Sequence, residues 1–163
     1  MKEPVRLAIK EAISNAPAMY SRLILLVGPS GSGKTHTLQK ISAEYGKEIL
    51  NVNLEMSKAL LELPIQRRQS QVQYVFKDII RDFMGNEDPQ TAIILLDNLE
   101  ILFDKDLKQD PLLLLQGASR NLTIIASWNG SWVERRLTFA IQGHQEYRFY
   151  DKIDAQIINL TDY

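Results

Sequence analysis

The stretch VGPSGSGKT, residues 27–35, decides how this chain is interpreted. It holds Gly28, Gly33, Lys34 and Thr35 in the spacing G-x-x-x-x-G-K-[ST], with small residues between them. Glycine and serine let backbone N–H groups close around phosphate oxygens, and a helix that begins at Gly33 turns its positive end toward the same anion. The stretch therefore predicts a loop that binds the phosphates of a nucleotide.

Each position of this loop has an expected contact. Lys34 should reach the β and γ phosphates, and the Thr35 hydroxyl should bind Mg²⁺. An apolar strand at 22–27 precedes the loop and an amphipathic helix follows it, which disfavours the alternative of a Gly/Ser turn with a surface lysine. ATP and Mg²⁺ are the predicted cofactors. The expected nucleotide contacts are Gly28, Pro29, Ser30, Gly31, Ser32, Gly33, Lys34, Thr35 and His36.

A second motif is the apolar run TAIILLD, residues 91–97, which predicts a buried strand ending in an acid. Asp97 is expected to hold the Mg²⁺ hydration shell beside Thr35, the alternative being a strand-end cap. A strand at 48–53 and a long helix with its apolar stripe over 72–84 lie between loop and acid. We therefore expect another strand between the loop strand and the Asp97 strand in the sheet.

The remaining elements complete an α/β pattern. A strand is expected at 122–129, a short helix at 132–137 capped by Ser131, and a late strand at 146–151. Strands that alternate with helices predict a mostly parallel five-stranded sheet with helices on both faces. We expect residues 1–163 to form a single domain, with a leading helix within 1–17 and a short tail at 152–163.

Composition limits the remaining chemistry. The formal net charge is −1, so any contact with DNA must rest on a local basic cluster. The chain has no cysteine and only two scattered histidines, His36 and His144, which disfavours thiolate chemistry and imidazole metal clusters. No apolar run approaches the roughly 18 residues of a membrane span, and the first residues lack a signal-peptide core. A cytoplasmic protein with no membrane contact is expected.

The order of these motifs resembles the RecA-like and AAA+ ATPases. In that resemblance Asn129, at the end of the 122–129 strand, matches the polar sensor 1 residue near the γ-phosphate; Ser127 is the fallback, and a turn residue before Gly130 is the alternative. Many AAA+ proteins carry an acid directly after the strand-end aspartate, but here Asn98 stands there and cannot accept a proton. Hydrolysis is therefore an open question.

Two other carboxylates are candidates for the missing acid. Glu55 resembles the catalytic glutamate of RecA-like proteins by its place after the second strand, and Glu100 lies three residues past Asp97. The alternative for both is an ordinary surface acid.

The resemblance to AAA+ proteins also bears on assembly. In AAA+ rings an arginine from this part of the fold reaches the neighbouring subunit's nucleotide, which makes Arg135 and Arg136 candidate fingers; solvated arginines, or a salt bridge with Glu134, are the alternative. About a dozen residues follow the last expected strand, too few for a complete helical lid. The adenine side would then be covered by the leading helix, the tail or another subunit, so a homo-oligomer is expected.

Taken together, GPSGSGKT, ILLDNLEILF and LTIIASWNG resemble, in that order, the BrxF family of small P-loop proteins from type 3 BREX phage-defence systems. The resemblance implies an ATP-binding component that acts with other phage-defence proteins, with DNA contacted directly or through partners. Three functions stay open: an ATPase, a nucleotide-gated assembly module with little hydrolysis, and a small-molecule kinase, since GPSGSGKT also resembles the guanylate kinase loop.

Overall fold

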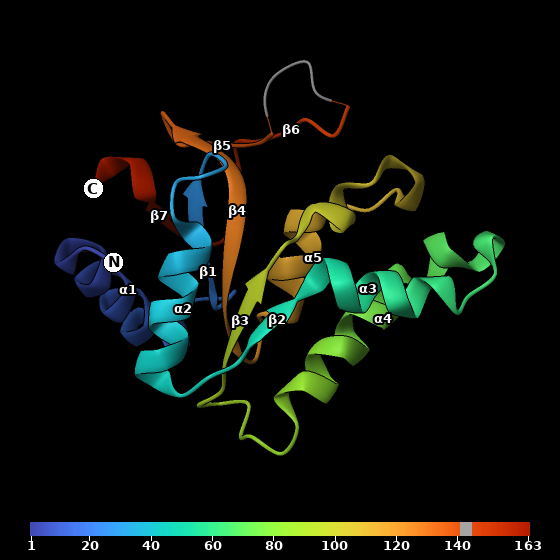
Figure 1. Cartoon of the computed structure of the whole chain (residues 1–163), viewed down its shortest axis with the longest axis horizontal. Helices are drawn as coiled ribbons and strands as arrows, with labels where there is room; N and C mark the ends of the chain where they lie inside the picture. The colour runs from blue at the N-terminus through green and yellow to red at the C-terminus, as the bar shows by residue number, and fades with distance from the viewer. Residues whose placement is uncertain (141–144) are drawn as a thin grey trace.

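The computed structural model describes residues 1–140 and 145–163, so His144 lies outside the described residues (Figure 1). The central sheet contains five parallel strands: β1 (Leu23–Gly28), β2 (Ile49–Asn51), β3 (Ile93–Asp97), β4 (Thr123–Val133) and β7 (Gln156–Asn159). Their order is β2-β3-β4-β1-β7. The predicted α/β fold is confirmed, and β4 is the strand that separates the loop strand from the Asp97 strand.

Helices cover both faces of this sheet because its central strands are apolar on both sides (Figure 1). Helices α1 (Glu3–Asn15) and α2 (Lys34–Tyr45) pack against Ile24 and Leu26 of β1. On the other face, α3 (Val52–Leu61), α4 (Ile65–Met84) and α5 (Pro111–Ala118) pack in the core that includes Leu23 and Leu25. Short 3₁₀ helices are η1 (Ala16–Ala18), η2 (Glu100–Phe103), η3 (Lys105–Leu107) and η4 (Leu160–Asp162).

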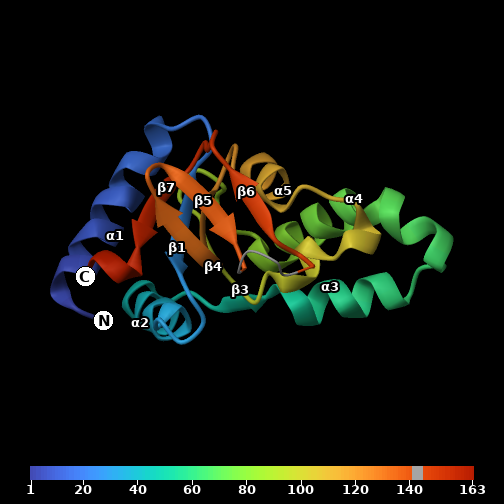
Figure 2. The same cartoon turned by 90° about the horizontal axis from the view of Figure 1, so that it is seen from above.

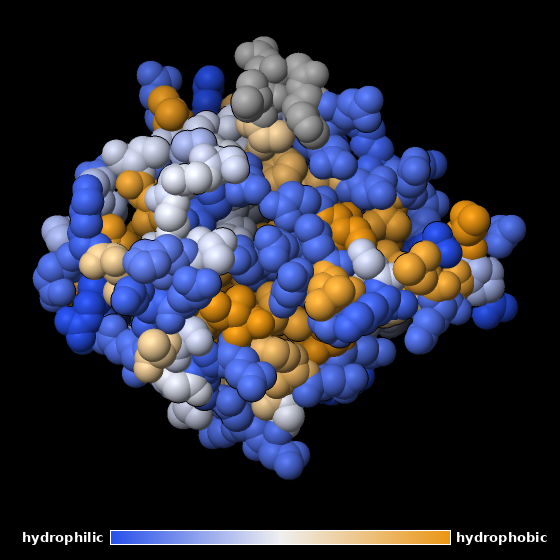
Figure 3. Space-filling model, in the orientation of Figure 1, coloured by the Kyte–Doolittle hydropathy of each residue, from blue (hydrophilic) through white to orange (hydrophobic). Residues whose placement is uncertain are grey.

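The second strand is shorter than expected, and a helix begins directly after it. The strand expected at 48–53 ends at Asn51, whose side-chain oxygen accepts a hydrogen bond from the Leu54 amide (3.1 Å) and caps α3. Helix α4 likewise begins at Ile65, before its apolar stripe. The two helices form an antiparallel pair whose far end carries exposed Leu61 and Ile65, where Figure 3 shows apolar surface.

The prediction of a helix at 132–137 is wrong, because this segment forms a β-hairpin. Strand β4 runs on to Val133, and β5 (Arg136–Phe139) and β6 (Arg148–Tyr150) add to it in antiparallel order. Glu134 and Arg135 have φ values of 50° and 63°, the left-handed pair that a tight two-residue hairpin turn requires. The buried side of the hairpin packs on Trp128, whose indole N–H donates to the Thr138 carbonyl (2.9 Å).

The fifth parallel strand comes from the segment expected to be a tail. The strand expected at 146–151 is present as β6, but it belongs to the hairpin, and β7 takes the position beside β1. Ile157 and Ile158 pair with Leu25 and Leu26 of β1. Two apolar residues among polar neighbours are too short a signal to predict a strand from the sequence alone.

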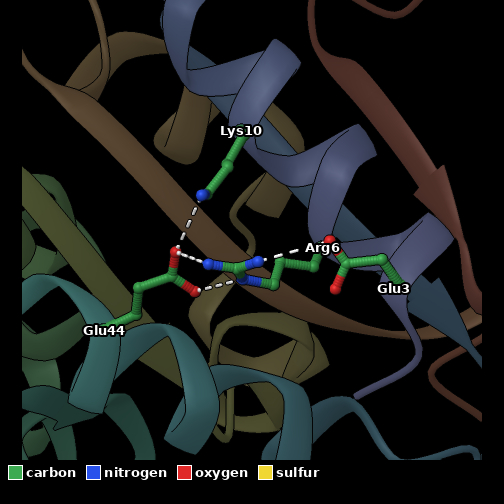
Figure 4. Close-up of polar contacts among 4 residues, drawn as sticks. All are labelled: Glu3, Arg6, Lys10 and Glu44. Carbon is green, nitrogen blue, oxygen red and sulfur yellow. Dashed lines mark hydrogen bonds and ion pairs between the residues drawn. The ribbon is translucent and has the colours of Figure 1, made fainter.

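An ion cluster joins the leading helix to the helix that follows the loop (Figure 4). Arg6 of α1 donates from Nε and Nη2 to the two carboxylate oxygens of Glu44 on α2 (3.0 Å each), Lys10 adds a contact of 3.2 Å, and Glu3 pairs with Arg6 at 3.3 Å. Exposed pairs of this kind contribute about 0–1 kcal/mol. Burial of the apolar stripe of α1 on the sheet supplies most of the stability of this contact.

Within residues 1–140 and 145–163 no helix combines the length and the apolar character needed to cross a bilayer.

We predict that Gly130→Ala destabilises the fold by about 1–3 kcal/mol, because a Cβ at this position would lie 1.7 Å from the Thr138 carbonyl oxygen. Thermal denaturation measures this change. The matched control is Gly117→Ala in α5, where a Cβ meets no atom within 4 Å and where alanine should stabilise the helix by up to about 1 kcal/mol. Equal melting temperatures for the two variants would contradict the hairpin geometry.

Candidate functional site

The loop predicted to bind phosphate lies at the carboxyl edge of the sheet, between β1 and α2. Gly31 and Gly33 have φ values of 79° and 92°, in the left-handed region that glycine adopts without strain. Gly33 directly precedes the first residue of α2, and the Ser32 amide donates to the Pro29 carbonyl (3.2 Å). The positive end of α2 therefore faces the inside of the loop, as an anion site requires.

Lys34 is held inside this loop. Its ammonium donates to the carbonyl oxygens of Gly28 (2.8 Å) and Pro29 (2.6 Å) and to the Ser32 hydroxyl (3.3 Å), and the residue is only 6% exposed. Burial lowers the pKa of Lys34, while the nearby charges of Asp97 and Glu100 partly oppose that shift. An anionic phosphate in the loop would restore the favourable environment of the charged ammonium.

Asp97, the last residue of β3, is buried (7% exposed) and accepts hydrogen bonds from three neighbours. The Thr35 hydroxyl donates to one carboxylate oxygen (2.9 Å), while the Ser127 hydroxyl and the Asn98 amide (3.0 Å) donate to the other. A hydroxyl beside a carboxylate is the hard oxygen donor set that Mg²⁺ takes together with phosphates and water. Thr35 and Asp97 therefore fit the predicted metal.

Glu100 lies at the start of η2, beside this cluster. Its Oε1 accepts from the Asn129 side-chain amide (2.7 Å), and its Oε2 accepts from the Asn53 side-chain amide (3.0 Å). Asn53 is itself fixed, because its side-chain oxygen accepts from the Ile101 backbone N–H (2.7 Å) and its backbone N–H donates to the Asn98 carbonyl (2.9 Å). Two amides thus hold the Glu100 carboxylate in one orientation.

These side chains surround one cavity of about 440 Å³. The described residues that line it are Ser30, Gly31, Gly33, Lys34, Thr35, His36, Asp97, Asn98, Glu100, Ser127 and Asn129. An adjoining cavity of about 670 Å³ shares Ser30, Glu100 and Asn129 and is walled by the hairpin. The structure therefore brings together the loop, Asp97, Glu100, Asn129 and the fallback Ser127.

Glu55 lies elsewhere. It occupies the first turn of α3, its side chain is 42% exposed, and its carboxylate pairs with Lys58 (3.6 Å). Among the described lining residues of the 440 Å³ cavity, Glu100 is present and Glu55 is not. Asn53, which orients Glu100, was missed by the sequence analysis; its signal was only an asparagine just past a short strand.

Arg135 and Arg136 lie at the turn of the hairpin, exposed to solvent. The Arg136 guanidinium lies 5.7 Å from the centroid of the Phe149 ring, and neither arginine belongs to the described lining of the 440 Å³ cavity. Within one copy of the chain they therefore do not reach the phosphate loop.

The two chain ends meet near the first turn of α2. The Met1 amino group lies 3.5 Å from His36 Nε2, and Lys2 contacts the Tyr163 backbone oxygen. Met1 and Leu160 also pack in the core beneath α1 and α2. The leading helix and the C-terminal segment thus both approach the His36 side of the loop.

We predict that Lys34→Ala abolishes stabilisation by nucleotide. A bound nucleotide at a hundredfold excess over its Kd stabilises a protein by roughly 2.7 kcal/mol, and the variant should lose that gain because it lacks the ammonium. Thermal shift with Mg-ATP checks this. Lys40→Ala, an exposed lysine on the same helix, is the control and should keep the full shift. An unchanged shift in Lys34→Ala would place the nucleotide outside the loop.

Comparison with solved structures found 80 similar chains, and the three that follow share 16–20% sequence identity with this chain. The AAA domain of FIGL-1 in complex with ADP aligns with 79% of this chain at 16% identity and a TM-score of 0.48. Katanin, from a study of its self-assembly, aligns with 79% of this chain at 18% identity and a TM-score of 0.43. AMPPCP-bound DnaA from Aquifex aeolicus aligns with 78% of this chain at 20% identity and a TM-score of 0.40. The aligned region covers 46%, 44% and 39% of these chains respectively, less than half of each.

No curated protein matched this chain in sequence. The sequence profile of the ATPase family associated with various cellular activities (AAA) matches residues 24–128, well over half of the 163 residues. That span runs from the loop strand through Asp97 to Trp128, and so includes the residues that hold Lys34, Thr35 and Asp97 in place. The chain therefore belongs to the AAA family.

Proposed function

We propose that this chain binds Mg-ATP in the loop and hydrolyses it, with Glu100 as the acid that the sequence left unassigned. The observation that carries this proposal is the position of Glu100. It lines the 440 Å³ cavity together with Lys34 and Asp97, and two side-chain amides orient it. A carboxylate can accept the proton of an attacking water, whereas the side chain of Asn98 cannot.

Different residues of the site bind the phosphates and the metal. Backbone N–H groups of the loop and the Lys34 ammonium bind the phosphate oxygens, and Thr35 and Asp97 hold Mg²⁺. When bound, Mg²⁺ neutralises charge that develops on the phosphate oxygens.

Glu100 and Asn129 act on the nucleophile. Glu100 takes a proton from water while the water oxygen bonds to the γ-phosphorus and the bond from that phosphorus to the β-γ bridging oxygen breaks, giving ADP and phosphate. Asn129, whose side-chain amide donates a hydrogen bond to Glu100 Oε1 (2.7 Å), orients the water or the γ-phosphate. Asn53 is a positioning residue, because it acts through Glu100.

The same geometry favours one alternative, a nucleotide-gated assembly module with little hydrolysis. Both carboxylate oxygens of Glu100 already accept an amide hydrogen bond, and Asn98 occupies the place of the usual acid. Because these bonds hold the carboxylate in one orientation, Glu100 can take a proton only from a water that approaches one of its remaining lone pairs, which slows turnover.

We further propose that the active form is a homo-oligomer in the cytoplasm. The exposed hairpin turn can present Arg135 or Arg136 to the nucleotide of a neighbouring copy, where an arginine stabilises the charge of the transition state. The resemblance of three motifs to the BrxF family supports a role as a component of a bacterial phage-defence (BREX) complex, with other defence proteins as partners and DNA contacted directly or through them.

We predict that Glu100→Gln lowers the rate of phosphate release by about 10²–10⁴-fold while ATP binding persists, because glutamine keeps the shape of the side chain but cannot take a proton. Phosphate release under saturating Mg-ATP measures this, with thermal shift as the binding readout. Glu55→Gln is the matched control and should retain the wild-type rate. A large loss in Glu55→Gln with a normal rate in Glu100→Gln would reverse the assignment.

We predict that phosphate release per chain rises with protein concentration, because the site of a monomer lacks the arginine that a neighbouring copy supplies. Removal of the finger by Arg135→Ala or Arg136→Ala should cost about 10³-fold or more in rate without loss of ATP binding. A rate per chain that stays constant over a wide concentration range, with both variants active, would show that the site is complete in one copy.

A further inference from the structure

The three-stranded sheet formed by β4, β5 and β6 has one buried side and one open side. Leu137, Phe139 and Tyr150 face the core, where the Phe139 ring stacks on Phe103 and Tyr150 packs edge-on against Trp128. Side chains alternate along a strand, so their neighbours face outward. The cross-strand pairs on that outward side are Ser131 with Thr138, Val133 with Arg136, and Thr138 with Phe149, and Figure 2 looks down on these strands.

This open side combines an exposed aromatic ring with positive charge. Phe149 is 49% exposed, the Arg136 guanidinium lies over its ring, and Val133 beside them is 61% exposed. Arg135 lies directly before Arg136, in the turn. No ion pair within residues 1–140 and 145–163 uses either arginine. The sheet holds the Arg136 guanidinium next to the ring, with Arg135 one residue away in the turn.

A second aromatic residue continues the surface toward the phosphate loop. Tyr147 lines the 670 Å³ cavity together with the hydroxyl residues Ser131 and Thr138 of the open side. The same cavity reaches Ser30 of the loop and Asn129. Aromatic rings, hydroxyls and arginines thus follow one path from the hairpin turn to the nucleotide site. The acids close to this path are Glu134 in the turn and Glu146 in the cavity wall.

We propose that the open side of this sheet binds a single-stranded polynucleotide, with bases stacked on Phe149 and Tyr147 and phosphates paired with Arg135 and Arg136. Aromatic side chains on a sheet stack unpaired bases whatever their sequence, and arginines beside them track the backbone. A duplex keeps its bases stacked internally and cannot use these rings. Because the whole chain has a net charge of −1, the attraction rests on the hairpin alone.

The test is fluorescence anisotropy of labelled oligothymidylate and oligouridylate at low salt, without ATP. Phe149→Ala should weaken binding about tenfold, since it removes the ring on which one base stacks. Phe149→Trp should restore it because the larger ring still stacks. Tyr74→Ala, which removes an exposed aromatic of α4, is the matched control and should bind as the wild type does. Arg135→Gln should lower the slope of log affinity against log salt by about 0.7.

Several results would overturn the proposal. They are the absence of oligonucleotide binding at low salt by protein that melts normally, equal affinity of Phe149→Ala and the wild type, or equal affinity for duplex and single strand. Tighter binding of one of the two oligonucleotides also supports it, since the two differ in the 2′-hydroxyl and in the methyl group of thymine. Since no ATP is present, failure of this test leaves the proposed ATP binding and the role of Glu100 in hydrolysis untouched.

Discussion

The carboxylate of Asp97 ties the candidate site to the fold. It lies at the end of a buried strand and accepts hydrogen bonds from Thr35 on α2, from Ser127 on β4 and from the Asn98 amide. Hydrogen bonds to a charged group contribute about 1.5–3 kcal/mol each, more than the usual neutral pair. These bonds fix the start of α2 against the carboxyl edge of the sheet, so the phosphate loop cannot shift without breaking them.

Glu100 depends on the same edge. The side-chain amides that hold it belong to Asn53, just past β2, and to Asn129, at the last parallel position of β4. The orientation of Glu100 therefore requires β2, β3 and β4 in their observed order. The hairpin that extends β4 then carries the outer wall of the neighbouring cavity. The strand β4 thus supplies Ser127 to Asp97 and Asn129 to Glu100, and it begins the surface proposed for a polynucleotide.

Much of this could be predicted from the sequence because its signals are local. The loop spacing, the apolar run that ends at Asp97 and the stripe of α4 each lie within one segment, and all three elements are present. The hairpin was mistaken for a helix because WVERRL holds helix-forming residues, while the left-handed turn at Glu134 and Arg135 follows from pairing with distant strands. The choice between Glu55 and Glu100 likewise depends on which acid the packing turns toward Lys34.

The central claim is that Lys34, Thr35, Asp97 and Glu100 surround the terminal phosphate of ATP. A crystal structure with Mg²⁺ and a non-hydrolysable ATP analogue tests it most directly. The account predicts Mg²⁺ on the Thr35 hydroxyl beside Asp97, the γ-phosphate on Lys34, and the Glu100 carboxylate facing that phosphate across one water. A nucleotide bound away from the loop, or a γ-phosphate whose nearest carboxylate is Glu55, would contradict it.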